Sequence, residues 1–170
     1  LNNEEYCENM GRYYFWTAAM NIAPSYATEM SPPMESEIER QGVCPSGWHI
    51  PDTLEWDELT VSYTTNDLMF QKGWLINLAS SNVRVLNGYF NTTGFSVVPV
   101  NLPYDTRRGV VGYNEIGRAA FLCTSNRYDQ EKFFAAEFSF SNVFLRPSYA
   151  YSKLYMNAQC SVRCVKNSED

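Results

Sequence analysis

No part of the chain constrains the fold more than residues 44–59, which read CPSGWHIPDTLEWDEL. A cysteine precedes a Pro-Ser-Gly turn, and residues 48–50 follow as a short extended piece. Asp52 is a favourable helix N-cap, and Glu55 stands three residues later, which is the spacing of a capping box. Pro51 separates the two elements because it continues neither a strand nor a helix. The segment therefore predicts a strand, a break and a capped helix in close succession.

The same segment predicts which side chains face inward. Trp48 and Ile50 share one face of the extended piece and His49 takes the other, because side chains alternate along a strand. In the helix, an apolar stripe continues at helical spacing through Trp56, Leu59 and Tyr63. We expect both tryptophans to be buried and the imidazole of His49 to make a structural hydrogen bond.

Length and charge bound the class of protein. The chain has 170 residues, of which 45% are hydrophobic, so it fits one domain of ordinary size, residues 1–170. Its net charge is −6 and no basic run occurs, so we expect no nucleic-acid partner. No apolar run approaches the roughly 20 residues of a membrane helix, so we expect no membrane insertion by this chain.

The remaining pattern predicts an α+β fold. Residues 11–20 change from an aromatic run to Ala-Ala-Met, which favours a strand or turn leading into a helix, and residues 34–41 favour a short helix. Residues 64–67 give a turn signal, and residues 101–117 read as a long loop or a loose hairpin. Strand-like segments dominate the second half of the chain, at residues 82–87, 95–100, 118–125, 133–140 and 160–165. We expect one or two helices, short antiparallel strands and several long loops.

Residues 133–140 alternate most clearly. One face carries Phe134, Ala136, Phe138 and Phe140. The other face carries Ala135, Glu137 and Ser139. This alternation predicts an antiparallel strand with one side on the core and the other side in water.

The cysteines favour disulfides over metal binding. The chain has one histidine, and its five cysteines form no Cys-x-x-Cys motif; they are Cys7, Cys44, Cys123, Cys160 and Cys164. A zinc site is therefore disfavoured, and disulfides formed in an oxidising compartment are expected. Five cysteines can form two bridges in fifteen ways, and an odd count leaves at least one thiol free or paired to something else. The spacing alone does not select the pairs.

Four motifs stand in the order and spacing of a known family. They lie at residues 7–19 (Cys, then Gly-Arg-Tyr-Tyr-Phe-Trp), 44–56 (Cys-Pro-Ser-Gly-Trp-His-Ile-Pro with Glu-Trp), 94–99 (Gly-Phe-Ser-Val-Val-Pro) and 161–165 (Ser-Val-Arg-Cys-Val). Together they resemble the Fibrobacter succinogenes major paralogous domain family, found widely in secreted and surface proteins of Bacteroidetes and Fibrobacteres. The resemblance covers nearly all of the chain.

This family is similar to formylglycine-generating enzymes and, more loosely, to C-type lectins. The resemblance therefore implies a C-type-lectin-like fold for residues 1–170, in which the termini come together and long loops form one face. It also implies a disulfide between Cys44 and Cys164, and it leaves the pairing of the other three cysteines open. Family members usually carry an upstream segment, so an N-terminal strand is either missing here or supplied by another chain.

The chain departs from the family mainly in its C-terminal third. Residues 121–124 read Phe-Leu-Cys-Thr where the family often has Phe-Trp-Ser-Ser, and residues 158–160 read Ala-Gln-Cys in place of Tyr-Gly-Phe. Some proteins with this fold have a C-terminal region diversified by a retroelement to vary the binding face. The composition of residues 126–159 is compatible with that hypothesis, which a nearby template repeat in the nucleotide sequence would test.

The sequence gives little support for catalysis. An oxidase like the formylglycine-generating enzymes would use Cys160 and Cys164, which strand alternation places on one face, but Cys164 is better assigned to the bridge with Cys44. The calcium-binding motifs of true C-type lectins are absent. We therefore expect no catalytic residues, no metal and no cofactor.

A binding role fits the composition best. Tyrosine, asparagine, serine and arginine form adaptable contact surfaces, and tyrosine offers a large area at low entropic cost. The candidate ligand-binding residues are Asn126, Arg127, Tyr128, Asp129, Arg146, Tyr149, Tyr151, Tyr155 and Asn157. The expected partner is a surface protein or glycan of a host or a bacterium, and a further chain or pilus subunit is a possible assembly partner.

The expected location is extracellular or at the cell surface, attached to the outer membrane. The alternative function is a structural or assembly domain of a surface protein with no ligand of its own. The sequence does not name the ligand or the oligomeric state.

Overall fold

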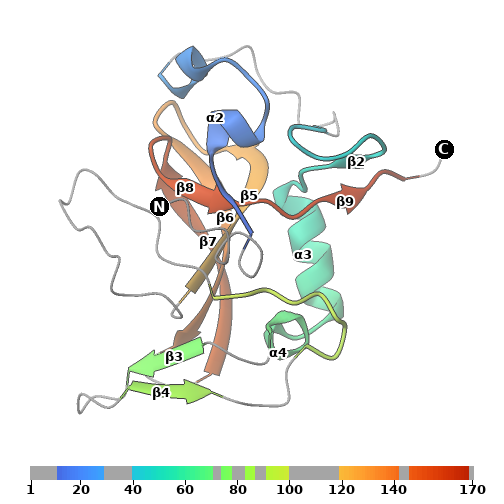
Figure 1. The fold of residues 1–170 in the computed structure, drawn as a ribbon, viewed down its shortest axis with the longest axis vertical. Coiled ribbons are helices and arrows are strands. Elements are labelled where there is room, and N and C mark those ends of the chain that lie inside the picture. Colours follow the sequence, from blue (N-terminus) through green and yellow to red (C-terminus); the bar gives the residue numbers. More distant parts are fainter. Residues whose placement is uncertain are drawn as a thin grey trace.

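The protein is described by a computed structural model (Figure 1). The structure describes residues 11–28, 40–70, 74–77, 83–86, 91–99, 119–141 and 146–168. Cys7, the helix expected at 34–41 and the loop expected at 101–117 fall wholly or mainly outside these residues.

The main sheet has five strands and joins the two ends of the described chain. Its order is β1-β8-β5-β6-β7, with bounds Tyr13–Phe15, Gln159–Ser161, Ala119–Arg127, Lys132–Ser141 and Arg146–Tyr155. β8 runs parallel to β5, and every other neighbouring pair in this sheet is antiparallel. β1 lies beside β8, so early and late parts of the chain meet in the sheet, as the C-type-lectin-like resemblance implies. The α+β class is confirmed.

Both faces of β6 are covered near the middle of the strand, which corrects the expectation that one of its sides lies in water. Ala135 is fully buried, together with its neighbour Phe133. Both pack against Trp16, whose ring centroid lies 6.2 Å from that of Phe133. On the opposite face, Phe138 packs against Trp56 at 5.9 Å. The predicted alternation of β6 is confirmed, but helices cover the middle of this strand from both sides.

The helices flank this sheet and are short apart from one. α2 comprises Trp16–Ala19, a 3₁₀ helix (η1) comprises Pro24–Ala27, α3 comprises Thr53–Ser62 and α4 comprises Thr65–Leu68. α2 follows β1 directly, as the change of pattern in residues 11–20 predicts. Residues 65–68 form a helix where we expected a turn, because Thr64 and Asp67 form a capping box.

α3 begins as predicted. Asp52 Oδ1 accepts a hydrogen bond from the backbone N–H of Glu55 at 2.9 Å, and the Glu55 carboxylate accepts one from the N–H of Asp52 at 3.0 Å. Trp56 is buried and Leu59 half-buried, but Tyr63 follows the last helical residue and is 48% exposed. The predicted apolar stripe therefore ends one turn early.

A two-stranded ribbon ties the 44–59 segment to the C-terminus. β2 (Trp48–His49) pairs antiparallel with β9 (Val165–Lys166), and the two lie side by side to the right in Figure 1. The disulfide between Cys44 and Cys164, implied by the family resemblance, is confirmed. Trp48 is 40% exposed, so the prediction that it is buried is wrong; a ribbon of two short strands covers only one side of its residues.

Residues 160–165 do not form the single strand predicted for them. Cys160 belongs to β8 in the main sheet and bonds to Cys123 of β5, whereas Cys164 bonds to Cys44. Both halves of Cys123–Cys160 are fully buried, so this second disulfide is part of the core. The chain changes sheets between the two cysteines.

Two further segments complete the description. β3 (Trp74–Asn77) and β4 (Val83–Leu86) form an antiparallel pair of their own, which confirms the strand predicted within residues 82–87. The strand predicted at 95–100 is wrong for its described part, because residues 95–99 contribute only an isolated bridge between Val97 and Met69.

Candidate functional site

The candidate site begins at the tight turn between β5 and β6. The backbone N–H groups of Tyr128 and Asp129 both donate to the carbonyl of Lys132, at 3.0 and 3.2 Å. Asp129 Oδ1 accepts from the N–H groups of Glu131 and Lys132, at 2.7 and 2.8 Å. The carboxylate of Asp129, a predicted contact residue, therefore holds the turn in shape.

Arg127 also stabilises this turn. Its Nε donates to the carbonyl of Asp129 at 3.2 Å, and its Nη2 donates to that of Gln130 at 2.7 Å. The guanidinium carbon lies 5.8 Å from the ring centroid of Trp16. These contacts assign Arg127 a structural role at the end of β5.

Aromatic side chains cross the sheet from this turn. We call the series Tyr128, Phe134, Tyr151, Tyr149 and Phe138 the aromatic row; its successive ring centroids lie 5.2, 6.0, 5.5 and 5.2 Å apart. Register explains the shared face, because Ala136 of β6 opposes Tyr151 of β7 and Phe138 opposes Tyr149. Three tyrosines of the predicted site are thus brought together.

The row is exposed at one end and covered by α3 at the other. Tyr128 is 44% exposed, whereas Tyr149 and Tyr151 are partly buried. The Tyr151 hydroxyl donates to the carbonyl of Thr53 and lies 2.9 Å from Asp57 Oδ1, so it anchors the start of α3 to the sheet.

Burial changes the acidity of both covered tyrosines. It raises the pKa of Tyr149 to about 12 from its ordinary value of 10.0. The pKa of Tyr151 is also raised, first by burial and then by hydrogen bonding, which includes the bond to Asp57. Both phenols therefore remain neutral at physiological pH, and Tyr151 in addition donates a hydrogen bond to the carbonyl of Thr53.

Two lysines contact tyrosine rings at the exposed end. Lys153 Nζ lies 3.8 Å from the ring centroid of Tyr128, and Lys132 Nζ lies 4.8 Å from that of Tyr155. Neither lysine was predicted from the sequence. Strand alternation could have placed Lys153 on the face of Tyr149 and Tyr151, but its approach to Tyr128 crosses β6 and depends on the register of three strands.

The other predicted residues are dispersed. Asn126 Oδ1 accepts from the backbone N–H of Thr53 at 2.7 Å and helps to dock α3. Asn157 is exposed in the turn between β7 and β8. Arg146 begins β7, at the far end of the strand from Tyr155, and its side chain lies outside the description. The structure therefore does not gather all nine residues into one patch.

The cysteines that an oxidase would use and the single histidine of the chain occupy structural positions. Cys160 and Cys164 are each bonded to a different cysteine, so they do not form the dithiol that an oxidase would use. His49 is buried, with Nε2 lying 2.8 Å from Glu55 and Nδ1 lying 3.0 Å from Asn167. Within the described ranges, no group of three or more His, Cys, Asp or Glu side chains could hold a metal ion.

Two structural features bear on location. The two disulfides indicate an extracellular or periplasmic protein, since such bonds persist in oxidising compartments. Of the helices that the structure describes, none has the length and apolar character needed to cross a bilayer.

Comparison with known proteins identifies the family. The model of the Fibrobacter succinogenes major domain matches residues 1–166, nearly the whole chain. No curated protein and no solved structure matches it. The match agrees with the four sequence motifs and with the Cys44–Cys164 disulfide. The chain therefore belongs to the Fibrobacter succinogenes major domain family.

Proposed function

We propose that this domain is an extracellular ligand-binding module of the adhesin type, and that it binds through the exposed end of the aromatic row. The observation that carries the proposal is the placement of Tyr128, 44% exposed, against the partly exposed ring of Phe134 at 5.2 Å. The ligand is a protein or glycan on a host or bacterial surface, and the domain forms the adhesive part of a surface lipoprotein or pilus. The proposal assigns no catalytic step to it.

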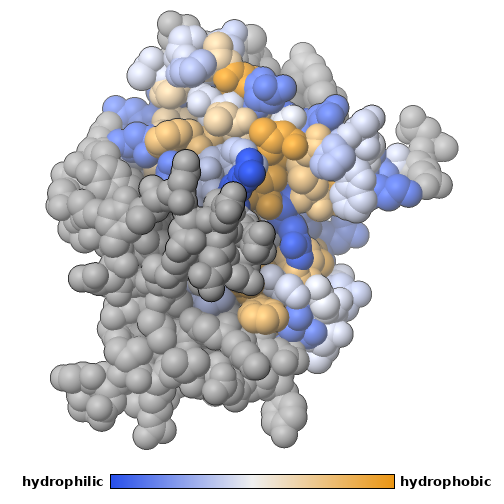
Figure 2. All heavy atoms as spheres, in the orientation of Figure 1, coloured by the Kyte–Doolittle hydropathy of each residue, from blue (hydrophilic) through white to orange (hydrophobic). Residues whose placement is uncertain are grey.

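The rings of the aromatic row are held in place by their neighbours, which favours a role in binding. Tyr151 bonds to α3, and Tyr149 packs against the cluster that contains Trp56 of α3. Phe134 contacts Tyr151 at 6.0 Å, so the exposed Tyr128 stands on a fixed aromatic base. Rings held in place lose little conformational entropy when a ligand covers them. On the face shown in Figure 2, hydrophobic and hydrophilic residues of the described chain are interspersed.

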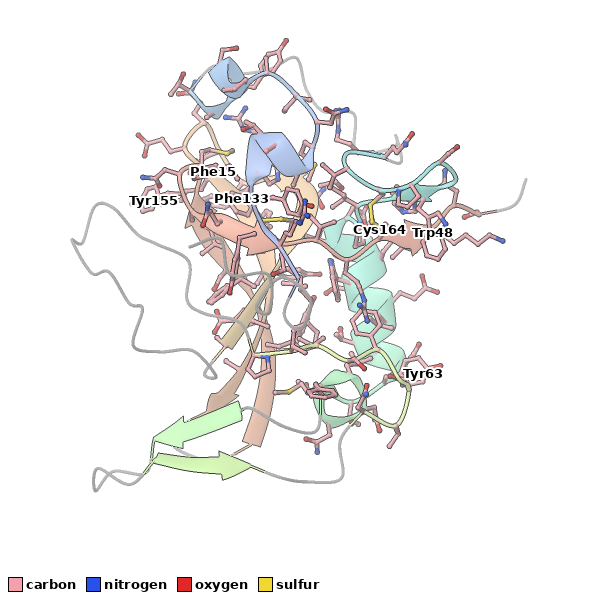
Figure 3. All side chains as sticks on the ribbon, viewed as in Figure 1. Phe15, Trp48, Tyr63, Phe133, Tyr155 and Cys164 are labelled. Carbon is pink, nitrogen blue, oxygen red and sulfur yellow. A yellow bond between two sulfur atoms is a disulfide. The ribbon has the colours of Figure 1, made fainter. Side chains whose placement is uncertain are left out.

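A matched pair of tyrosine variants tests the proposal. The oxidised domain is screened on a glycan array and in pulldowns with surface proteins, and Tyr128→Ala is compared with Tyr63→Ala. The two tyrosines are similarly exposed, at 44% and 48%, and Tyr63 lies beyond the far end of α3 (Figure 3). We expect Tyr128→Ala to weaken binding by about tenfold or more, as loss of an exposed interface tyrosine can, and Tyr63→Ala to leave it unchanged. Equal binding by both variants would contradict the proposed site.

One observation favours a structural or assembly domain as the second candidate. Asn126 and Tyr151, both predicted contact residues, bond to the first residue of α3 instead of facing solvent freely. In that role the tyrosine-rich region would serve packing alone. A structural domain should give no ligand in either screen, and changing Tyr151 should lower folding stability without a binding defect.

A further inference from the structure

We propose that the exposed end of the aromatic row binds an anionic saccharide, and that Lys132 and Lys153 contact its negatively charged group. This inference rests on the proposed function and specifies its ligand class. It depends on two lysines that stand beside tyrosine rings at the β5–β6 turn, Lys153 beside Tyr128 and Lys132 beside Tyr155.

The two lysines occupy neighbouring positions on one face of the sheet. Lys132 of β6 opposes Tyr155 of β7, and Phe134 opposes Lys153, so the lysines are diagonal neighbours across an antiparallel pair. Diagonal positions in such a pair lie about 7–8 Å apart. This spacing is that of the residue positions. The side chains reach rings on either side of β6, Tyr128 after β5 and Tyr155 of β7, so the two ammonium groups can contact the acidic groups of one saccharide.

Each ammonium remains able to bind an anion. A lysine ammonium has three donors, and a tyrosine ring 3.8 or 4.8 Å away occupies only one side of it. Within the part of the chain that the structure describes, neither lysine forms an ion pair. The ring contacts also restrain two long side chains, which lowers the entropic cost of using them in binding.

The charge around the turn is compatible with a negative ligand. Arg127, Lys132 and Lys153 supply three cations, against the carboxylates of Asp129 and Glu131. Asp129 Oδ1 is engaged by two backbone N–H groups of the turn, at 2.7 and 2.8 Å. Arg127 bonds to carbonyls of the turn and lies against Trp16, so Lys132 and Lys153 are the cations of the patch itself.

A saccharide fits this surface better than a peptide does. β6 is paired on both sides, by β5 and β7, and the N–H groups of Tyr128 and Asp129 both donate to Lys132 within the turn. The rings and lysines of the patch project from one face of the sheet, whereas a peptide that adds as a further strand would pair with the outer edge of β7, the last strand of the sheet. The patch offers phenol rings, hydroxyls and ammonium groups, which suit the C–H faces, hydroxyls and acid group of an anionic sugar.

A charge-matched pair of double variants tests the inference. Lys132→Gln plus Lys153→Gln removes two positive charges from the patch. The control, Arg12→Gln plus Lys166→Gln, also removes two positive charges. Arg12 precedes β1 and Lys166 lies in β9, and both side chains are exposed. The probes are an oligogalacturonate and its carboxyl-reduced counterpart, a heparin oligosaccharide and its desulfated, N-acetylated and carboxyl-reduced counterpart, and polyglutamate as an acidic peptide. Binding is measured by calorimetry at low and at physiological ionic strength.

We expect an acidic oligosaccharide to bind. Its neutral counterpart should bind at least about tenfold more weakly, because it loses the hydrogen bonds between its acid groups and the lysines. The lysine double variant should lose at least as much, the control pair should not, and added salt should weaken binding. Equal binding of neutral and acidic sugars, or binding of polyglutamate alone, would overturn the saccharide class while leaving the proposed binding function in place. Failure of every probe here and of every ligand in the wider screens would overturn both.

Discussion

His49 Nε2 lies 2.8 Å from one carboxylate oxygen of Glu55, and the other oxygen of Glu55 accepts from the backbone N–H of Asp52 at 3.0 Å. One side chain therefore joins the buried imidazole of β2 to the first turn of α3. A carboxylate can only accept, so Nε2 carries the proton in this pair. Nδ1 of His49 faces Asn167, just beyond β9, at 3.0 Å, so a single cluster connects the ribbon and the helix.

Glu55→Ala should lower the free energy of unfolding by about 2–4 kcal/mol. The substitution removes the capping box, which is worth about 1 kcal/mol. It also takes the carboxylate away from Nε2 of the buried His49, which costs about 1–3 kcal/mol. Urea denaturation followed by circular dichroism measures the change. Glu58→Ala, at an exposed position on the same helix, serves as the control and should stay within about 0.5 kcal/mol of the parent. If Glu55→Ala lowered the free energy of unfolding by less than about 0.5 kcal/mol, the role assigned to the cluster would be contradicted.

Removing the bridge from β2 to the C-terminus should also be costly. Cys44→Ala plus Cys164→Ala opens a loop with a sequence separation of 120 residues. Releasing the unfolded chain from this constraint should lower stability by about 3–5 kcal/mol. Peptide mapping under non-reducing conditions checks the pairing first, and thermal and urea denaturation measure the loss. A map that pairs Cys44 with any cysteine other than Cys164 would refute this assignment.

Gly42 allows the close approach of the loop before β2 to α2. Its φ is +54°, and a Cβ at this position would lie 2.3 Å from the carbonyl oxygen of Ala19 and 2.6 Å from Cδ1 of Ile50. Gly42→Ala should therefore cost about 2–5 kcal/mol, from left-handed strain and from a clash with backbone. Gly47→Ala is the matched control: its φ is +78°, but nothing lies within 4 Å, so only about 1–2 kcal/mol of strain is expected. Equal losses in denaturation experiments would show that the clash at Gly42 relaxes freely.

The hydroxyl of Tyr151 should stabilise the domain independently of any ligand. Tyr151→Phe keeps the ring in the aromatic row but removes the hydrogen bonds to Thr53 and Asp57, at a cost of about 1–2 kcal/mol. Tyr128→Phe should change stability by less than about 0.5 kcal/mol, because Tyr128 is exposed. Urea denaturation of both variants measures the difference. A destabilised Tyr128→Phe and an unaffected Tyr151→Phe would reverse the roles given to the two ends of the row.

Local chemistry made part of the fold predictable. The capping box of Asp52 and Glu55 depends on residues three apart, so the start of α3 followed from the sequence directly. The Cys44–Cys164 bridge came from the family resemblance and not from spacing. The pairing of Cys123 with Cys160 was not predicted, because no local feature of the sequence distinguishes it from the other possible pairings.

Coverage by distant parts of the chain was not predictable. Alternation correctly placed Ala135 and Ala136 on opposite faces of β6, but α2 and α3 bury both faces, and no pattern within the strand encodes that. Trp48 is the converse case, because it lies on a ribbon whose outer side is open. For the site, composition predicted the tyrosines, whereas the approach of Lys153 to Tyr128 required the register of three strands.

Alkaline pH should destabilise the domain through the covered tyrosines. Folding raises the pKa of Tyr149 from 10.0 to about 12, and that of Tyr151 in the same direction, so both phenols stay neutral longer in the folded state. Their contribution to stability is then complete below pH 10 and is lost as the pH rises through the folded pKa, because the unfolded state ionises first. Unfolding free energies measured from pH 8 to 12 should fall above about pH 10, and Tyr149→Phe should reduce that slope. Phenolate absorbance of the folded domain that rises in a single step with its midpoint near pH 10 would contradict the burial of these two rings.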